Sequence, residues 1–126
     1  MSTATSLLLV VDVGNTHTVV GVYRGPELRG HWRIATEPHR TPDELGVLLR
    51  SLFALVEIRV EDIEGIIVSS VVPALVSTLE EVASEYFHRS PVVVGPGIRT
   101  GISMLRGESS SRLLLRVAGY TTQLPP

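Results

Sequence analysis

The stretch of sequence that decides the fold is VVDVGNTHTVVGVYRG, which runs from Val10 to Gly25. An apolar run ends at Asp12, small polar residues follow at once, and a second apolar run then begins with no helical pattern between them. A carboxylate and several amide and hydroxyl groups are therefore expected in a turn between two strands. Because Mg²⁺ prefers oxygen ligands and successive turn N–H groups can hold an anion, this turn predicts a site for phosphate and magnesium.

A plain β-turn is the alternative interpretation, since Asp-x-Gly-Asn is common turn chemistry. The length of the polar segment argues against it. A tight hairpin needs only two turn residues, whereas six of the seven positions from Asp12 to Thr18 are polar or small. We therefore expect a longer, ligand-binding turn, in which Gly14 lets the backbone approach a ligand closely and adopt angles that other residues avoid.

The composition narrows the classes of protein to which the chain can belong. Its 126 residues suit one domain, and 44% hydrophobic residues with a net charge of -2 indicate a soluble globular protein. The absence of cysteine excludes disulfides and thiolate metal sites. No clustered basic stripe is present, so we expect no nucleic-acid partner. The apolar run from Ser6 to Val13 is too short to span a membrane and has no positive residue before it, so we expect no membrane partner and a cytoplasmic location.

All eleven basic residues are arginines, and lysine is absent. This excludes the P-loop GxxxxGK[ST] and the usual protein-kinase lysine, and the GxGxxG dinucleotide motif is missing as well. Phosphate would therefore have to be bound by backbone N–H groups, hydroxyls, amides, arginine or a metal ion.

The hydrophobic pattern predicts the element order β-β-β-α-β-α-β, which is typical of a mixed sheet with helices packed on it. Alternation over residues 27–35 predicts a half-exposed strand with Leu28, Gly30, Trp32 and Ile34 on one face, and we expect Trp32 to be in the core. A helix is expected to begin at Thr41, since Pro42 follows the cap and Glu44 completes a capping box. The remaining expected elements are a strand over residues 65–69, a helix over 73–87 with Leu75, Leu79, Val82 and Tyr86 on one face, and a strand near 90–95.

Four motifs in the same order resemble type III pantothenate kinases: DVGNTHTVVGVY, HWRIATEPHRTPDELGVLLRSLF, SSVVP and VVVGPGIRTGI. The resemblance covers about Leu7 to Ser103. It implies a ribonuclease-H-like domain, one half of an actin/sugar-kinase/Hsp70-type fold with a nucleotide cleft. On this basis residues 1–104 are the N-terminal nucleotide-phosphate-binding domain, and residues 105–126 are a divergent tail.

The resemblance also implies a function and a site. The function is ATP-dependent phosphorylation of pantothenate to 4'-phosphopantothenate, the first step of coenzyme A biosynthesis, by a homodimer that uses Mg²⁺ and a monovalent cation, K⁺ or NH4⁺. In the family the segments Ser69–Pro73 and Gly95–Gly101 line the cleft, although we expect Val71 and Val72 to be core residues. Asp12 is the expected metal ligand, and the residues expected to bind the ATP phosphates are Asp12, Val13, Gly14, Asn15, Thr16, His17, Thr18 and Val19.

The resemblance ends after Ile102. The family continues there with a Gly-Ala-Asp-Arg motif that supplies the catalytic base, and this motif is absent from the sequence. The three aspartates are Asp12, Asp43 and Asp62, and Glu108 is the only acidic side chain after Glu85. No catalytic residue is therefore assigned, and the tail is of the kind that truncation or a frame shift leaves. The alternative function is a non-catalytic nucleotide-binding remnant or a regulatory partner. A zinc site is disfavoured because the four histidines lie far apart in the sequence: His17, His31, His39 and His88.

Overall fold

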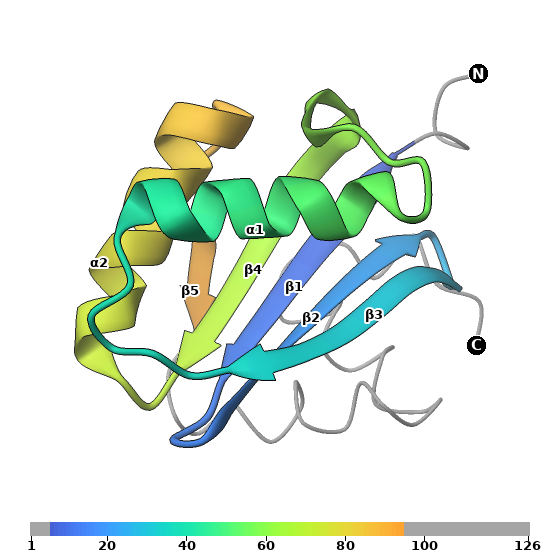
Figure 1. Ribbon diagram of the computed structural model, residues 1–126. Helices are drawn as coiled ribbons and strands as arrows, with labels where there is room; N and C mark the ends of the chain where they lie inside the picture. Colours follow the sequence, from blue (N-terminus) through green and yellow to red (C-terminus); the bar gives the residue numbers. More distant parts are fainter. Residues whose placement is uncertain (1–5, 95–126) are drawn as a thin grey trace.

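The computed structural model describes residues 6–94. The segment Gly95–Gly101, Glu108 and the tail 105–126 lie outside the described residues. The expected order of elements is confirmed (Figure 1). The elements are β1 (Leu7–Val13), β2 (His17–Arg24), β3 (Glu27–Ala35), α1 (Pro42–Ala54), the short 3-10 turn η2 (Val60–Asp62), β4 (Ile63–Ser70), α2 (Pro73–Val82), the π-helical turn η3 (Ala83–Phe87) and β5 (Val92–Val94).

The strands form one mixed sheet in the order β3-β2-β1-β4-β5. The first three strands pair antiparallel, while β1 pairs parallel with β4 and β4 pairs parallel with β5. Because β1 and β4 run in the same direction, their carboxyl ends meet at one edge of the sheet. This is the edge at which open α/β sheets bind ligands.

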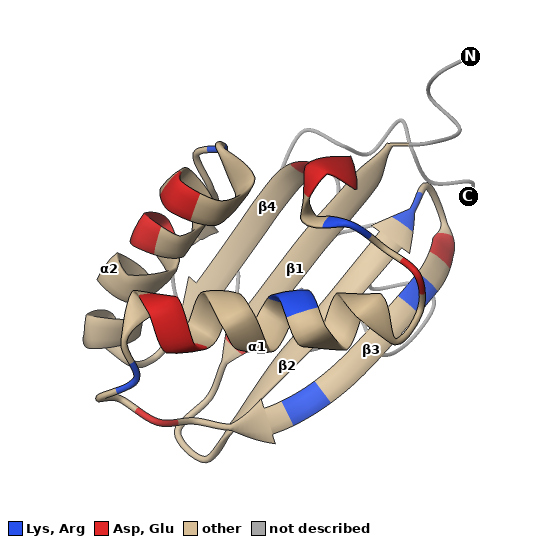
Figure 2. Ribbon diagram, turned by 45° about the horizontal axis from the view of Figure 1, so that its top comes forward, with Lys and Arg blue, Asp and Glu red and all other residues tan. Residues whose placement is uncertain are grey.

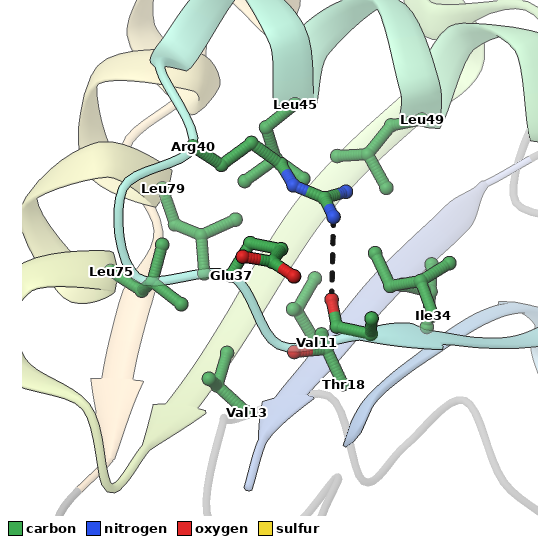
Figure 3. A pocket seen from close by; sticks show the side chains of 12 residues that line it. Val11, Val13, Thr18, Ile34, Glu37, Arg40, Leu45, Leu49, Leu75 and Leu79 are labelled. Carbon is green, nitrogen blue, oxygen red and sulfur yellow. Dashed lines mark hydrogen bonds between the residues drawn. The ribbon is translucent and has the colours of Figure 1, made fainter. Parts of the chain in front are cut away.

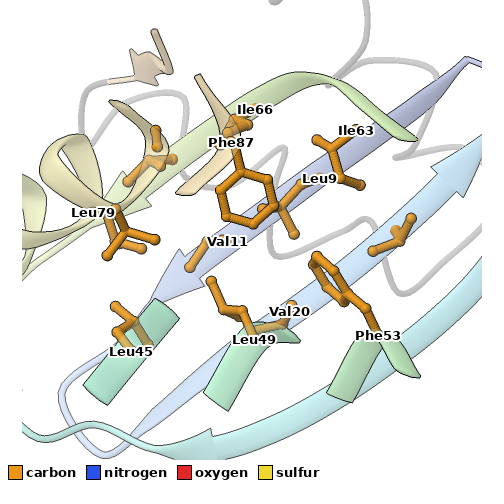
Figure 4. Packing of buried hydrophobic residues seen from close by; sticks show 14 of the residues in the cluster. Leu9, Val11, Val20, Leu45, Leu49, Phe53, Ile63, Ile66, Leu79 and Phe87 are labelled. Carbon is orange, nitrogen blue, oxygen red and sulfur yellow. The ribbon is translucent and has the colours of Figure 1, made fainter. Parts of the chain in front are cut away.

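Both helices cover the same face of the sheet (Figure 1). The core lies between them and the strands, and Figure 4 shows how the side chains of the two layers interdigitate. Phe53 of α1 is fully buried and lies between Trp32 and Phe87, with ring centroids 5.9 and 6.0 Å away. Trp32 is partly buried and packs against this core, as expected. No helix among residues 6–94 is long and apolar enough to cross a membrane.

The capping box at the start of α1 is confirmed. The backbone N–H of Glu44 donates to Thr41 Oγ1 at 3.1 Å, and the N–H of Thr41 donates to Glu44 Oε1 at 2.8 Å. Pro42 occupies the first turn, where its missing N–H is not needed. The local sequence therefore fixes the point at which the loop after β3 becomes a helix.

The predicted face of β3 is correct except at Leu28. Val22 pairs with Gly30, but Tyr23 pairs with Leu28, so that Arg29 is an extra residue in the strand. Such a bulge reverses the alternation of side chains beyond it. Leu28 therefore lies beside Gly21 on the face away from the helices and is 47% exposed.

The second helix continues through η3 to Phe87 and ends at His88, which has a φ of 56°. Leu75, Leu79 and Val82 are buried as expected, whereas Tyr86 is only half-buried. Its ring lies over Gly46 of α1, where an added Cβ would be 2.7 Å from Tyr86 Cε1. The hydroxyl of Tyr86 donates to Asp43 Oδ1 at 2.6 Å, and this hydrogen bond raises the pKa of the Tyr86 phenol above its usual value. The two helices thus contact each other at a glycine.

We expect Gly46→Ala to destabilise the protein by about 1 kcal/mol, because steric overlap with Tyr86 outweighs the better helix propensity of alanine. The measurement is denaturant unfolding, with exposed Val47→Ala on the same helix as the control. In a Tyr86→Ala background the same Gly46→Ala change is expected to stabilise the protein. Stabilisation by Gly46→Ala in the wild-type background would show that the close helix contact is unimportant.

Candidate phosphate and metal site at the ends of β1 and β4

Asp12 lies within β1, one residue before its end, and is only 4% exposed. Side chains alternate along a strand. Val11 and Val13 belong to the core under the helices, so Asp12 lies on the opposite face of the sheet. It is the only charged residue of β1, whereas the other charges lie mostly on helices, loops and β3 (Figure 2).

Ser69 of β4 is the neighbour of Asp12 across the parallel pair. The two Cα atoms are register partners in strands about 4.8 Å apart, so the two side chains lie next to each other on the same face. Ser69 is fully buried, and its Oγ has no hydrogen-bond partner among the described residues. A buried hydroxyl without a protein partner generally bonds to water or an ion. A carboxylate beside such a hydroxyl fits Mg²⁺, which commonly binds one or two carboxylates while keeping several waters.

The turn after Asp12 is tighter than the sequence led us to expect. Strand pairing continues through Asp12, Val13 and Thr18, and the loop between the two strands is Gly14–Thr16. The N–H of Gly14 closes this hairpin by donating to the carbonyl oxygen of His17 at 2.9 Å. The expectation of a longer turn was wrong because polar side chains at the strand ends do not stop the backbone ladder.

The expected unusual backbone angle at Gly14 is also not present. Among the glycines that the structure describes, the positive φ belongs to Gly25, at 57°. What remains at Gly14 is the small size of the residue, which suits a close approach of a ligand to the backbone.

The predicted contact residues lie in different environments. Asn15, Thr16 and His17 are exposed at the tip of the hairpin, and Val19 is half-buried. Within residues 6–94 no acceptor receives the backbone N–H of Asn15 or of Thr16. Two N–H donors therefore lie just beyond the edge that Asp12 and Ser69 occupy.

Thr18 is buried on the helix side of the sheet, unlike Asp12. Its Oγ1 lies 2.9 Å from Thr36 Oγ1, in the loop after β3. Thr36 Oγ1 in turn donates to the carbonyl oxygen of Gly14 at 2.9 Å, and the N–H of Thr36 donates to the carbonyl oxygen of Thr16, also at 2.9 Å. Thr36 was not predicted from the sequence, where it is simply a threonine between an alternating strand and a helix cap.

The SSVVP segment adjoins the same edge. The N–H of Val71 donates to the carbonyl oxygen of Val13 at 3.0 Å, and Ser70 Oγ accepts from the N–H of Val72 at 2.9 Å. Val72 packs against the core as expected. Val71 is 37% exposed, so its assignment to the core was wrong: its backbone continues the β1 pairing while its side chain faces outward.

The family model and the curated relatives that match this chain point to the same protein family. The family model for type III pantothenate kinase matches residues 8–111. The type III pantothenate kinase of Exiguobacterium sibiricum is 54% identical over 98 residues, which are 78% of this chain and 39% of that protein. That of Geobacillus kaustophilus is 45% identical over 117 residues, which are 90% of this chain and 45% of that protein. The chain thus spans less than half the length of these curated relatives.

Two solved structures share the fold. A ROK hexokinase from Thermus thermophilus superposes with a TM-score of 0.58 at 13% identity, over 79% of this chain and 38% of the hexokinase. RuvC from T. thermophilus, solved with a Holliday junction substrate, gives a TM-score of 0.52 at 16% identity, over 93% of this chain and 79% of RuvC. Both likenesses concern the fold alone, and they confirm the expected ribonuclease-H-like domain of the actin/sugar-kinase type. The sequence matches, which extend over most of its length, show that this chain belongs to the type III pantothenate kinase family.

Proposed function

We propose that the chain forms the ATP-phosphate-binding part of a pantothenate kinase, which phosphorylates pantothenate at the first step of coenzyme A biosynthesis. The observation that carries this proposal is the pairing of buried Asp12 with buried Ser69 at the edge of the sheet. The exposed hairpin tip lies immediately beyond this pair, and within residues 6–94 no acceptor receives its N–H groups at Asn15 and Thr16. Membership in the kinase family supports the same reaction.

Each group has a distinct role in this proposal. The Asp12 carboxylate would hold Mg²⁺, and the Ser69 hydroxyl would bond to a water of the metal's shell. The metal, when bound, supplies positive charge that offsets the negative charge of the phosphates. The N–H groups of Asn15 and Thr16 donate to phosphate oxygens, and their polar side chains lie at the same exposed tip. This set provides charge stabilisation and positioning, which are the main requirements of phosphoryl transfer.

A non-catalytic nucleotide-binding protein is the second candidate. It is favoured by the position of the last aspartate in the 126 residues, Asp62, because the expected catalytic aspartate would follow Ile102. A hydroxyl that attacks phosphorus needs a base within hydrogen-bond reach. The two candidates share nucleotide binding and differ in turnover, so separate experiments test them.

The first experiment tests the metal site. We expect Asp12→Asn to weaken Mg-ATP binding about tenfold or more, since a carboxylate–Mg²⁺ contact becomes an amide contact. ATP affinity in excess EDTA is expected to stay unchanged. Calorimetric titration measures both affinities, circular dichroism checks folding, and Asp62→Asn, which lies in the surface pair with Arg59, is the matched control. Equal Mg-ATP affinity in Asp12→Asn and the wild type would remove Asp12 from the site.

The second experiment tests catalysis. We expect no pantothenate-dependent ADP release from the 126-residue chain, because no general base is identified in it. A coupled ADP-release assay with pantothenate and Mg-ATP provides the measurement, and a full-length relative is the positive control. Turnover that Asp12→Asn abolishes would contradict this expectation and favour the kinase over the non-catalytic candidate. Glu108 would then be the first residue to replace.

A further inference from the structure

We propose that Thr36 is a positioning residue for the phosphate-binding turn, and that it aims the N–H of Asn15 toward the face of the sheet that carries Asp12. The proposal rests on the proposed function, since it assigns a role within the same ATP-phosphate site. Thr36 lies 22 residues from Gly14 in the sequence and holds the turn through two of its own polar groups.

The hydrogen-bond directions follow from counting protons. A threonine hydroxyl has one proton to donate. The partner of Thr36 Oγ1 at Gly14 is a carbonyl oxygen, which can only accept, so the Thr36 proton goes there. Thr18 must then be the donor in the Thr18–Thr36 pair. In this arrangement the Thr18 proton is committed to Thr36, and Thr18 contributes to the site through the turn rather than by donating to a phosphate.

The surroundings of Thr18 explain why its hydroxyl needs the hydrogen bond to Thr36. Thr18 lines a cavity of about 20 Å³ between the sheet and the helices, room for about one water molecule. The other lining side chains are aliphatic, as Figure 3 shows, except for those of Glu37 and Arg40. A hydroxyl facing apolar side chains is costly to bury unless it is hydrogen-bonded. Thr36 provides that bond, and losing it would leave Thr18 unsatisfied.

The hydrogen bond from Thr36 to the Gly14 carbonyl also determines where the N–H of Asn15 points. The carbonyl of Gly14 and the N–H of Asn15 belong to one peptide unit, which is planar and trans. In a trans unit the two groups point in opposite directions. The Gly14 carbonyl points to Thr36, which adjoins Thr18 on the helix side of the sheet. The N–H of Asn15 therefore points away from the helices, toward the face on which Asp12 and Ser69 lie.

The elements that precede and follow Thr36 in the chain are both fixed in place. It directly follows Ala35, the last residue of β3, whose carbonyl oxygen accepts a long hydrogen bond of 3.5 Å from Arg40 Nη2 (Figure 3). The capped start of α1 follows at Thr41. The hydroxyl is therefore presented by a short segment between a paired strand and a fixed helix end, which suits a positioning role.

The test compares Thr36→Val, Thr36→Ser and Thr78→Val in the whole chain. Valine has nearly the shape of threonine but no hydroxyl, and serine restores the hydroxyl. Thr78 is the matched control, since its hydroxyl also donates to a backbone carbonyl, that of Ala74, on the exposed side of α2. Two quantities are measured for each protein: the Mg-ATP dissociation constant, and the amide exchange rate of Gly14, whose N–H closes the hairpin. The exchange rate of the Val71 amide reports on the adjoining strand end.

We expect Thr36→Val to weaken Mg-ATP binding about tenfold and to accelerate Gly14 exchange by a similar factor, as the loss of one to two hydrogen bonds implies. Exchange at Val71 is expected to change less than twofold, and Thr36→Ser and Thr78→Val are expected to stay within twofold of the wild type in both measurements. Unchanged Gly14 exchange in Thr36→Val would overturn the proposal whether or not ATP binds. Faster exchange with unchanged affinity would overturn it too. Failure of the wild-type chain to bind Mg-ATP would contradict the proposed function instead, and the Gly14 exchange rate would then decide alone whether Thr36 holds the turn.

Discussion

The parallel pairing of β1 with β4 is the contact on which the rest of the structure depends. It places the central strand between an antiparallel hairpin on one side and the helix-connected strands on the other. It also sets a register in which Asp12 meets Ser69. A shift of this register by one residue would move every side chain of β1 to the opposite face, taking the core residues away from the helices and placing Asp12 beneath them. One register therefore determines both the stability of the domain and the composition of its candidate site.

One face of β1 contributes to the hydrophobic core, and the other carries the candidate metal ligand. Leu9 and Val11 pack under α1 and α2. In the same core, Phe53 of α1 contacts Trp32 on the edge strand β3 and Phe87 at the end of the second helix. Asp12, on the other face, is a buried carboxylate, which is costly unless it is paired or hydrogen-bonded. In this otherwise aliphatic strand, Asp12 is the residue to which the proposed function assigns the Mg²⁺ ion.

The Thr18–Thr36 pair connects these two faces. Its hydroxyls lie on the helix side, yet through the Gly14 carbonyl they set the orientation of a peptide group whose N–H faces the other side. Rigid backbone donors of this kind are effective because they need no reorganisation when charge develops on a ligand. The hairpin tip can therefore be exposed to solvent and still present its donors in a defined direction.

Much of this protein was predictable from its sequence, because the relevant physical signals are local. Helix capping at Thr41, the aliphatic run before Asp12 and the alternation in β3 each involve neighbours a few residues apart, and the structure confirms the elements they predict. Three features required the tertiary structure: the bulge at Arg29 that turns Leu28 outward, the burial of Asp12 next to Ser69, and the contact of Thr36 with Gly14. Each depends on which strands pair and in which register. Thr36 and Gly14 lie 22 positions apart and Asp12 and Ser69 lie 57 apart, so these two pairs leave no periodic signal in the sequence and only the folded chain decides their contacts.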